Sequence, residues 1–512
     1  MDSHIFVEIL LVLLKITYLI TSILLIIYGS NCYTYVFLFL KHRKKRREAD
    51  EHFLKAFYVR HKEKDFPPVT TQLPIFNEKY VALRLIDAVV AMDYPREKHE
   101  VQVLDDSLDD TWDIVEAHIR PLIEQGHDIK HIRRSDRRDF KAGALQAGLA
   151  TARGEFVSIF DSDFVPPPEF LKKTVPYLVE QPKVGFVQTR WGHLNRSESL
   201  LTRAQAIGID GHFVIEQSAR QWSNLYLNFN GTAGIWRKAA INGSGGWQGD
   251  TLTEDLDLSY RAQLAGWKTE FLFDVECRAE IPADMNAFKA QQFRWAKGSI
   301  QVAKKLLTTL YRSPLSPWKK AQATVHLTHY SIHPLIVINA LISLPMIMFT
   351  EQIKFSMYYV LVVMLLSLAT FAPTFMYVVS QWGRGAGWMR RLWEIPFLAV
   401  VGIGIGVNNS WAVISALFGG KGVFIRTPKT GSQVDTGVAK RKAQSKGYKL
   451  KWNWVIAVEL ALASYCLYAF AYFLNHEAVP GGSILVAPFL LLYGVAFMSA
   501  FLLSIRHSVQ RS

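Results

Sequence analysis

The chain has 512 residues, a formal net charge of +14 and a composition that is half hydrophobic and 13% aromatic. This length exceeds one ordinary domain, and a mean hydropathy of +0.10 indicates a folded soluble part combined with lipid-facing segments. The basic residues collect beside hydrophobic runs, as in 41–47, which favours membrane topology over nucleic-acid binding. Cys32, Cys277 and Cys466 lie far apart and indicate neither a zinc site nor a disulfide framework.

The N-terminal segment is predicted to be a retained membrane anchor. Residues 5–28 are long and apolar enough to cross a bilayer, which needs about 20 residues. No small-residue cleavage site follows them, so they are not read as a signal peptide. The basic run 41–47 places this end in the cytosol and the N-terminus outside. We therefore assign 1–49 as a transmembrane anchor with a basic juxtamembrane segment.

Residues 50–300 alternate apolar β runs with amphipathic stretches, a pattern that predicts an α/β domain. Three predicted strands run into polar residues. The first lies within 68–78, the second runs from Val101 into Asp105-Asp106, and the third, over 155–160, ends in Asp161-Ser162-Asp163. In open α/β sheets ligands bind at the carboxyl ends of the strands, so these acids are candidate site residues.

Each acidic pair also allows a structural interpretation. Asp105 and Asp106 can accept hydrogen bonds from a base and a ribose, but Asp-Asp-Ser is also a good turn or helix cap. Asp161 and Asp163 can flank one hard cation. Mg²⁺ or Mn²⁺ there would bridge a diphosphate. The alternative is a polar loop after a strand.

Thr253-Glu254-Asp255 begins an amphipathic run, and Thr253 is predicted to be its N-cap. Asp255 is a candidate general base for an acceptor hydroxyl. The alternative is that both acids simply favour a helix N-terminus.

Gln291, Arg294 and Trp295 are spaced so that one helix face presents all three. The planar fork of Arg294 suits a diphosphate, and Trp295 offers a platform for a sugar ring. An interfacial anchor is the alternative for Trp295. Lys141 is predicted either to bring a further cation to the phosphates or to belong to a solvated basic loop.

The remaining chain is predicted to be largely membrane-embedded. The segment 392–418 is ambiguous, because it is interrupted by Glu394 and several glycines and precedes a basic loop, 419–451, that the positive-inside rule keeps in the cytosol. We therefore predict that it lies at the interface and that the protein has five spans. The predicted segments are an interfacial helix (301–320), a transmembrane helix pair (321–382), interfacial helices with a basic loop (383–452) and a C-terminal transmembrane pair (453–512).

Three histidines, His326, His329 and His333, share one face of the first span after the α/β domain. Their spacing permits a metal site. A polar stripe that lines a bundle interior or channel is the favoured interpretation.

The chain resembles glycosyltransferase family 2, specifically its processive membrane synthases. The resemblance rests on four motifs in this order: Asp105-Asp106-Ser107, Asp161-Ser162-Asp163, Thr253-Glu254-Asp255 and Gln291-Gln292-Phe293-Arg294-Trp295. The resemblance covers about residues 66–310. The segment Phe424-Ile425-Arg426-Thr427-Pro428-Lys429 resembles the gating loop of cellulose synthases. Together with Asn228-Phe229-Asn230-Gly231-Thr232-Ala233-Gly234, it looks closest to the cellulose synthase-like mannan and glucan synthases.

The resemblance implies a cytosolic, Rossmann-like GT-A domain embedded in an α-helical transmembrane protein, and an inverting, metal-dependent transfer. It also implies roles for the site residues. Asp106 would contact the nucleoside, with Asp105 nearby. Asp161 would contact the nucleotide and the metal, and Asp163 would contact the metal. The nucleotide sugar would be bound by Lys141, Gln291 and Arg294, and the acceptor by Glu254 and Trp295. Asp255 would be the base, and Phe424, Arg426, Thr427 and Lys429 would form the gate.

The function so implied is processive synthesis of a β-linked glucan, mannan or glucomannan from UDP-glucose or GDP-mannose, with translocation of the polymer. The expected cofactor is Mg²⁺ or Mn²⁺, and the expected partners are the growing polysaccharide and membrane lipid, with no nucleic acid. The expected location is the plasma membrane, or the Golgi in a eukaryote. The alternative is a non-processive enzyme that adds one sugar to a lipid. A transporter or scaffold with a degenerate domain is opposed by the intact acids of the three acidic motifs.

Overall fold

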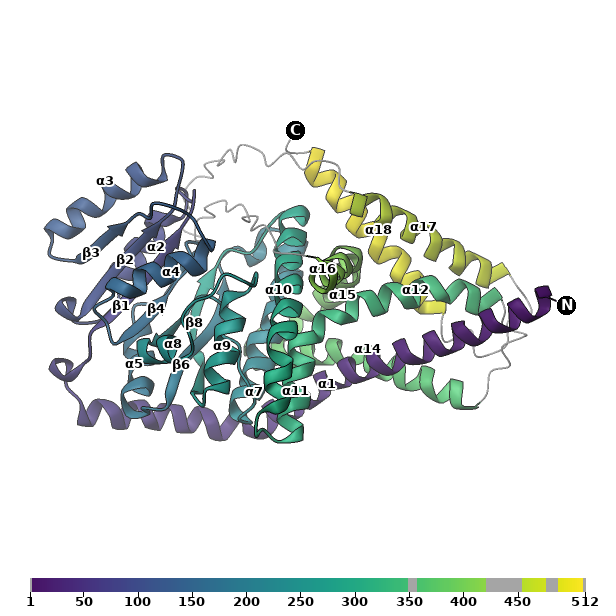
Figure 1. Ribbon diagram of the computed structural model, residues 1–512, viewed down its shortest axis with the longest axis horizontal. Helices are drawn as coiled ribbons and strands as arrows, with labels where there is room; N and C mark the ends of the chain where they lie inside the picture. Colours follow the sequence, from purple (N-terminus) through teal and green to yellow (C-terminus); the bar gives the residue numbers. More distant parts are fainter. Residues whose placement is uncertain (1, 349–356, 420–453, 476–486, 510–512) are drawn as a thin grey trace.

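The computed structural model describes residues 2–348, 357–419, 454–475 and 487–509. An α/β body forms one end of the molecule, and a set of long helices forms the other (Figure 1). The predicted gating residues Phe424, Arg426, Thr427 and Lys429 lie outside the described residues.

The α/β body is built on one mixed sheet of eight strands, in the order β3-β2-β1-β4-β7-β6-β8-β5, within the described ranges. The strands β3, β2, β1 and β4 run parallel to one another, β7 is antiparallel to β4 and β6, and β8 is parallel to β6. The carboxyl ends of β2, β1, β4 and β6 therefore follow one another along the same edge. The strands are β1 (Val69–Ile75), β2 (His99–Asp105), β3 (Asp128–Ile132), β4 (Phe156–Ile159), β5 (Phe164–Val165), β6 (Val184–His193), β7 (Gly234–Arg237) and β8 (Lys268–Ala279).

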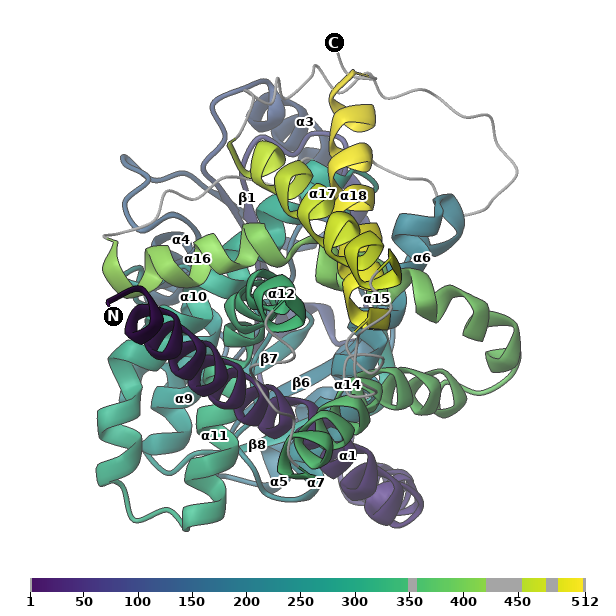
Figure 2. The ribbon, with the colours of Figure 1, turned by 90° about the vertical axis from the view of Figure 1, so that its right-hand side faces the viewer.

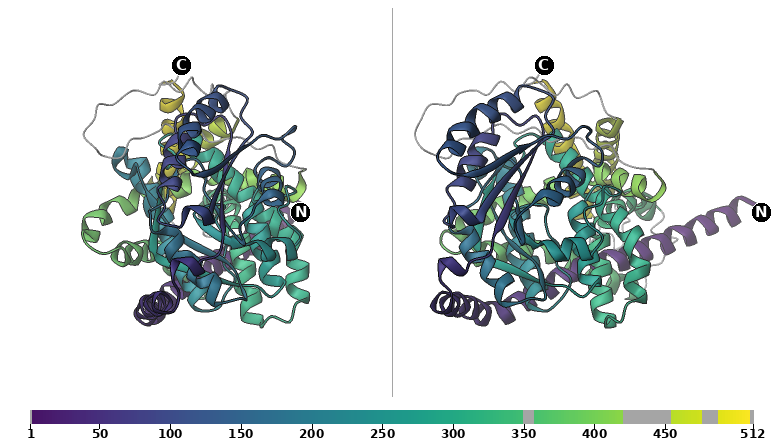
Figure 3. Two further views of the ribbon diagram at one scale, coloured as in Figure 1. Left: turned by 90° about the vertical axis from the view of Figure 1, so that its left-hand side faces the viewer. Right: turned by 60° about the vertical axis from the view of Figure 1, so that its left-hand side comes forward.

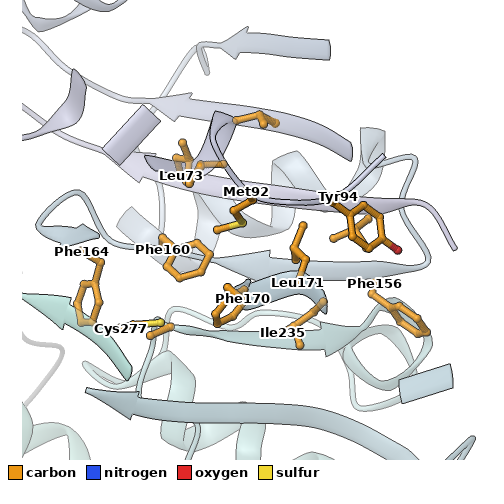
Figure 4. Close-up of a cluster of buried hydrophobic side chains, with 14 of the residues drawn as sticks. Leu73, Met92, Tyr94, Phe156, Phe160, Phe164, Phe170, Leu171, Ile235 and Cys277 are labelled. Atoms are coloured by element: carbon orange, nitrogen blue, oxygen red, sulfur yellow. The ribbon is translucent and has the colours of Figure 1, made fainter. Parts of the chain in front are cut away.

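Both faces of this sheet are covered, because its strands are apolar on both sides. In the β4 region, Phe156 and Phe160 join one core, while Val157 and Ile159 join the other. The first core lies under α2 (Ala82–Val90), α3 (Thr111–Glu124) and α5 (Phe170–Glu180) and is drawn in Figure 4. The second lies under α4 (Phe140–Thr151), α8 (Lys238–Gly243) and α9 (Glu254–Leu264). The three strands predicted from the sequence are β1, β2 and β4.

The anchor is a single helix, α1 (Asp2–Arg60), that is longer than predicted. It leaves the helical end and runs along the α/β body (Figures 1 and 3). Its Phe39 packs into one core of the body and its Phe57 into the other. The helix therefore continues past residue 49, the boundary predicted for the anchor, and its later part packs against the body.

The predicted helix over 301–320 is divided between two elements. Its first part belongs to α10 (Met285–Arg312) and its last part to α11 (Pro317–Thr328). Pro314 and Pro317 explain the break, because proline cannot continue a helix from within. This prediction of one helix is wrong.

Five described helices are long and apolar enough to cross a membrane, as predicted: Val7–Arg60, Pro317–Met348, Met364–Gly383, Trp454–Asn475 and Pro488–Ser508. The ambiguous segment forms η6 (Trp388–Glu394), α15 (Ile395–Gly404) and α16 (Gly406–Phe418), with a bend of 43° before α16. It passes the same test only as a bent pair. In Figure 2 the segment crosses the bundle near α12 (Ile332–Met348), and α16 packs against α10. Its interfacial location stays a prediction.

The histidine stripe is spread over α11, a 3₁₀ turn at His329–Ser331, and α12. His326 Nδ1 lies 2.7 Å from the Tyr260 hydroxyl, and His333 Nε2 lies 2.9 Å from the Asn409 amide. Within the described ranges no group of three metal-ligating side chains occurs, so the metal interpretation has no support there.

Candidate active site

One cavity of about 190 Å³ lies at the carboxyl edge of the sheet, between that edge and α10. It brings together residues that are far apart in the sequence. Those predicted from the sequence and found in its lining are Asp106, Lys141, Asp161, Asp163, Glu254, Asp255, Gln291, Arg294 and Trp295. The edge of the sheet and one helix face thus form a single site.

Asp105 does not line the cavity, in contrast to its predicted role. Its carboxylate is fully buried and accepts a hydrogen bond of 2.8 Å from the Ser107 amide. Its other oxygen lies 3.2 Å from His131 Nε2. Asp105 is the last residue of β2, and successive side chains of a strand point to opposite sides, so only Asp106 of the pair lines the cavity. The prediction for Asp105 is therefore corrected to a structural role.

Two arginines that the sequence motifs did not reveal shape one end of the cavity. Arg134 holds Asp106 through both carboxylate oxygens, with its Nε 3.1 Å from Oδ1. The guanidinium of Arg137 lies 3.4 Å from the ring centre of Phe76, directly after β1. The signal for both is the mixed-charge loop before α4. A carboxylate, an aromatic ring and a cationic plane suit a nucleobase and its ribose.

Asp161 and Asp163 follow β4, as predicted, and both face the cavity. Asp161 pairs with Lys141, whose Nζ also donates to the Gly231 carbonyl at 2.9 Å. The two aspartates fit a hard divalent cation, because such an ion takes one or two carboxylates and completes its shell with phosphate and water oxygens. The Lys141 ammonium at Asp161 shows that this position accepts positive charge.

Asp255 lies in the first turn of α9, and one of its oxygens accepts from the Leu256 amide at 2.8 Å. Burial and the neighbouring Glu254 carboxylate raise the pKa of Asp255 to about 7, while Lys141 opposes the rise. A carboxylate with a pKa near neutrality is suited to take a proton. Thr253 occupies the N-cap position, as predicted, although its hydroxyl makes no capping hydrogen bond.

Gly231 allows the backbone to approach both charged groups. Its φ is +79°, and an added Cβ would lie 3.0 Å from Asp255 Oδ2 and 3.4 Å from Lys141 Nζ. The positive φ favours glycine, and the crowding adds a second reason for it.

Gly231→Ala is therefore expected to lower the turnover rate more than tenfold, because the methyl group displaces a charged side chain. Gly266→Ala is the matched control, since Gly266 has a φ of +94° with nothing within 4 Å of the added Cβ. It should cost about 1 kcal/mol of stability and leave turnover unchanged. Steady-state rates and melting temperatures of both variants measure this. Equal rates for the two would show that crowding at Gly231 is harmless.

Gln291, Arg294 and Trp295 lie on α10 and line the cavity opposite the sheet edge. The helix approaches the Thr-Glu-Asp motif closely, because a Cβ on Gly298 would lie 2.5 Å from Thr253 Cγ2. The predicted helix face is therefore present and packs directly against α9.

The first turns of α10 are held in place by polar contacts with the C-terminal helices of the bundle. Lys289 Nζ lies 2.7 Å from the Glu459 carboxylate on α17 (Trp454–Asn475) and 2.7 Å from the Ser504 hydroxyl on α18 (Ala487–Val509). Lys289 and Glu459 are both buried. The wall that carries Gln291 and Arg294 is thus tied to the C-terminal helix pair.

Comparison with known proteins agrees with this geometry. The profile described as "Glycosyltransferase like family 2" matches residues 67–298. A glucomannan 4-beta-mannosyltransferase 1 of Oryza sativa subsp. japonica is 31% identical over 417 residues, covering 78% of this chain and 76% of that protein. A glucomannan 4-beta-mannosyltransferase 2 of Arabidopsis thaliana is 41% identical over 261 residues, or 50% of this chain and 49% of that protein. For several such relatives the match spans about half of their length.

Among solved structures, the mannosyltransferase PcManGT of Pyrobaculum calidifontis, in complex with GDP-Man and Mn²⁺, is 18% identical. The match covers 76% of this chain and 99% of that one, with a TM-score of 0.48.

The mixed sheet with aspartates along its carboxyl edge is the GT-A-like fold that was predicted. The chain belongs to glycosyltransferase family 2, which confirms the predicted family.

Proposed function

We propose that the protein is a nucleotide-sugar-dependent hexosyltransferase that polymerises a β-linked mannan or glucomannan. The observation that carries the proposal is the convergence of Asp106, Asp161, Asp163, Asp255 and Arg294 on one cavity. The likeness to glucomannan 4-beta-mannosyltransferases supports mannose as the transferred sugar and a guanosine diphosphate donor.

The chemistry follows from the positions of the charges. Asp255 takes the proton of an acceptor hydroxyl as that oxygen attacks the anomeric carbon from the face opposite the diphosphate, which inverts the configuration there. Lys141 and Arg294 carry positive charge on the cavity wall and stabilise the negative charge that develops on the departing diphosphate. Trp295 provides an apolar surface for the acceptor sugar.

Asp161 and Asp163 would hold Mg²⁺ or Mn²⁺, which supplies further neutralisation of the diphosphate. Exhaustive EDTA treatment is therefore expected to abolish activity, and either cation should restore it, because both acids offer only hard oxygen ligands. A radiolabelled-donor assay of protein treated with chelator, with and without added metal, measures this. Full activity in EDTA would contradict the proposed metal dependence.

Location in the membrane is part of the proposal. Five described helices have the length and apolarity of spans, and the basic segment 41–47 of α1 favours a cytosolic α/β body. Helix α10 lines the cavity and packs against both α9 and the bundle helix α16. A growing polymer would therefore leave the cavity toward the helices. We therefore propose that the polymer is also translocated.

Donor screening with purified protein in lipid nanodiscs tests the function. GDP-[¹⁴C]mannose and UDP-[¹⁴C]glucose would be supplied separately and together, and the products digested with β-mannanase or cellulase. A high-molecular-weight product that β-mannanase degrades supports the proposal. A product that extracts into organic solvent and carries one sugar supports instead the alternative, addition of a sugar to a lipid.

A further inference from the structure

The carboxyl end of β6 reaches the cavity with two polar groups that the catalytic scheme does not use. Trp191 and His193 are two residues apart on one strand, so their side chains share a face, and both line the cavity. Trp191 Nε1 and His193 Nδ1 are buried and have no hydrogen-bond partner among the described residues. Buried polar atoms in folded proteins normally have a partner, so two together in the cavity lining mark a place where a bound ligand can supply one.

The Trp191 ring is held firmly. It stacks on Phe213 with ring centres 4.8 Å apart and meets the edge of Phe164 at 5.1 Å. Phe164 directly follows Asp163, so the indole lies next to the predicted metal-binding segment. An indole N–H can only donate a hydrogen bond.

The His193 side chain is positioned by a hydrogen bond to Asp210. This side chain is 1% exposed, and Nε2 lies 3.1 Å from Asp210 Oδ1. Arg384 reaches both oxygens of Asp210 at 2.7 Å, and Gln381 donates to one of them at 2.9 Å. Burial would raise the pKa of Asp210, but Arg384 and His193 hold that pKa well below its usual range.

This arrangement fixes the chemistry of the imidazole. Asp210 accepts a hydrogen bond from the His193 Nε2–H, and in that tautomer Nδ1 is the acceptor atom of the ring. The end of β6 therefore offers the cavity one donor, Trp191 Nε1–H, and one acceptor, His193 Nδ1. Hydroxyl groups both donate and accept, so neighbouring hydroxyls of a sugar ring satisfy both.

The sheet order places this pair at the sugar end of the site. Along the carboxyl edge, Asp106 follows β2, Phe76 follows β1, and Asp161 and Asp163 follow β4. Beyond β4 comes the loop of Gly231 before β7, and then β6. A nucleoside at Asp106 and a diphosphate at Asp161 and Asp163 thus direct the hexose toward β6.

We propose that Trp191 and His193 form a hexose-binding subsite that recognises sugar hydroxyl groups, with Asp210 as the positioning residue behind His193. The subsite rests on the proposed function and deepens it. Its ligand is a hexose, either the one attached to the nucleotide or the terminal one of the acceptor, because both bring the same hydroxyl chemistry to this part of the cavity.

Two variants remove one hydrogen bond each. Trp191→Phe keeps an aromatic ring and loses the N–H. His193→Gln keeps a donor near the Nε2 position for Asp210 and loses the acceptor at Nδ1. Trp236→Phe is the matched control, because the Trp236 N–H is also buried and unpartnered, but this residue lies in the core and not in the cavity lining. Melting temperatures of the full-length variants establish that each is folded.

Affinities for GDP and GDP-mannose, measured by calorimetry, and the KM for a β-1,4-mannooligosaccharide form the readout. If the subsite holds the donor hexose, each cavity variant binds GDP-mannose roughly tenfold more weakly and GDP as before. If it holds the acceptor hexose, donor affinity stays constant and the oligosaccharide KM rises by the same factor. A deoxy-mannose ligand that lacks the recognised hydroxyl should bind wild type weakly. It should bind the variant that lacks the corresponding hydrogen-bonding group with the same affinity as wild type.

Unchanged affinities and KM in both folded variants, or equal losses for GDP and GDP-mannose, would overturn the subsite while leaving the proposed function intact. Wild-type protein that binds neither GDP-mannose nor UDP-glucose would reject the proposed function itself, and the subsite with it. These results are distinguishable because the second is seen in wild type alone.

Discussion

Replacing Asp255 by asparagine is expected to abolish hexosyl transfer and to leave nucleotide-sugar binding nearly intact. The side chain keeps its size and its contact with the Leu256 amide, but it can no longer take a proton. Loss of a general base typically costs roughly 10²–10⁴-fold in rate. Single-turnover transfer rates and calorimetric binding of the donor measure the two effects separately.

The pH dependence provides an independent check on this role. The base works only when deprotonated, so a pKa of about 7 predicts that kcat/KM falls as the pH drops below 7 and levels off above it. Lys141 opposes the rise in the pKa of Asp255, so Lys141→Met should move the acidic limb to higher pH. Asp257→Asn is the control, because this buried acid pairs with Arg261 and Lys305 instead of facing the cavity. Near-normal turnover of Asp255→Asn would reject the base assignment.

Glu459→Leu is expected to destabilise the protein strongly. It leaves the Lys289 ammonium buried without its carboxylate, and removing one partner of a buried ion pair costs about 3–5 kcal/mol. Because Lys289 lies two residues before Gln291, turnover of the folded fraction should fall as well. Thermal unfolding of detergent-solubilised protein and specific activity per folded molecule measure these effects.

The double variant Lys289→Met with Glu459→Leu is the decisive partner experiment. It removes both charges, so most of the lost stability should return. Additive losses in the double variant would show that the two side chains do not act as a pair. Lys55→Met is a suitable surface control, because Lys55 forms an exposed pair with Glu51 that contributes little.

Much of the site could be predicted because its acids directly follow apolar strands. Parallel strands align their carboxyl ends, so Asp106, Asp161 and Asp163 had to meet if β1, β2 and β4 were neighbours. The helical spacing of Gln291, Arg294 and Trp295 likewise fixed their common face. The acids that end each strand and the helical spacing can both be read from local sequence.

The rest depended on features that local sequence does not contain. The choice between Asp105 and Asp106 depends on a single residue of strand register, which reverses the direction of every side chain. Trp191 and His193 lie at the end of a strand too, but the carboxyl end of β6 lies at this edge because β7, between β6 and β4, is antiparallel to both. Arg134 and Arg137 lie in a loop whose path is set by the packing of α4. Asp210 and Arg384 meet across 174 positions of sequence.

The uninterrupted helix α1 makes the protein sensitive to the thickness of its membrane. Its 59 residues rise 1.5 Å each, which gives a rod of roughly 90 Å, about three times the depth of a hydrocarbon core. A bilayer that is thinner than the apolar part of a helix makes that helix tilt. Here no loop separates the tilting part from the part that is packed into both cores of the catalytic body. A change in lipid composition that tilts α1 would therefore rotate the whole α/β body relative to the membrane plane.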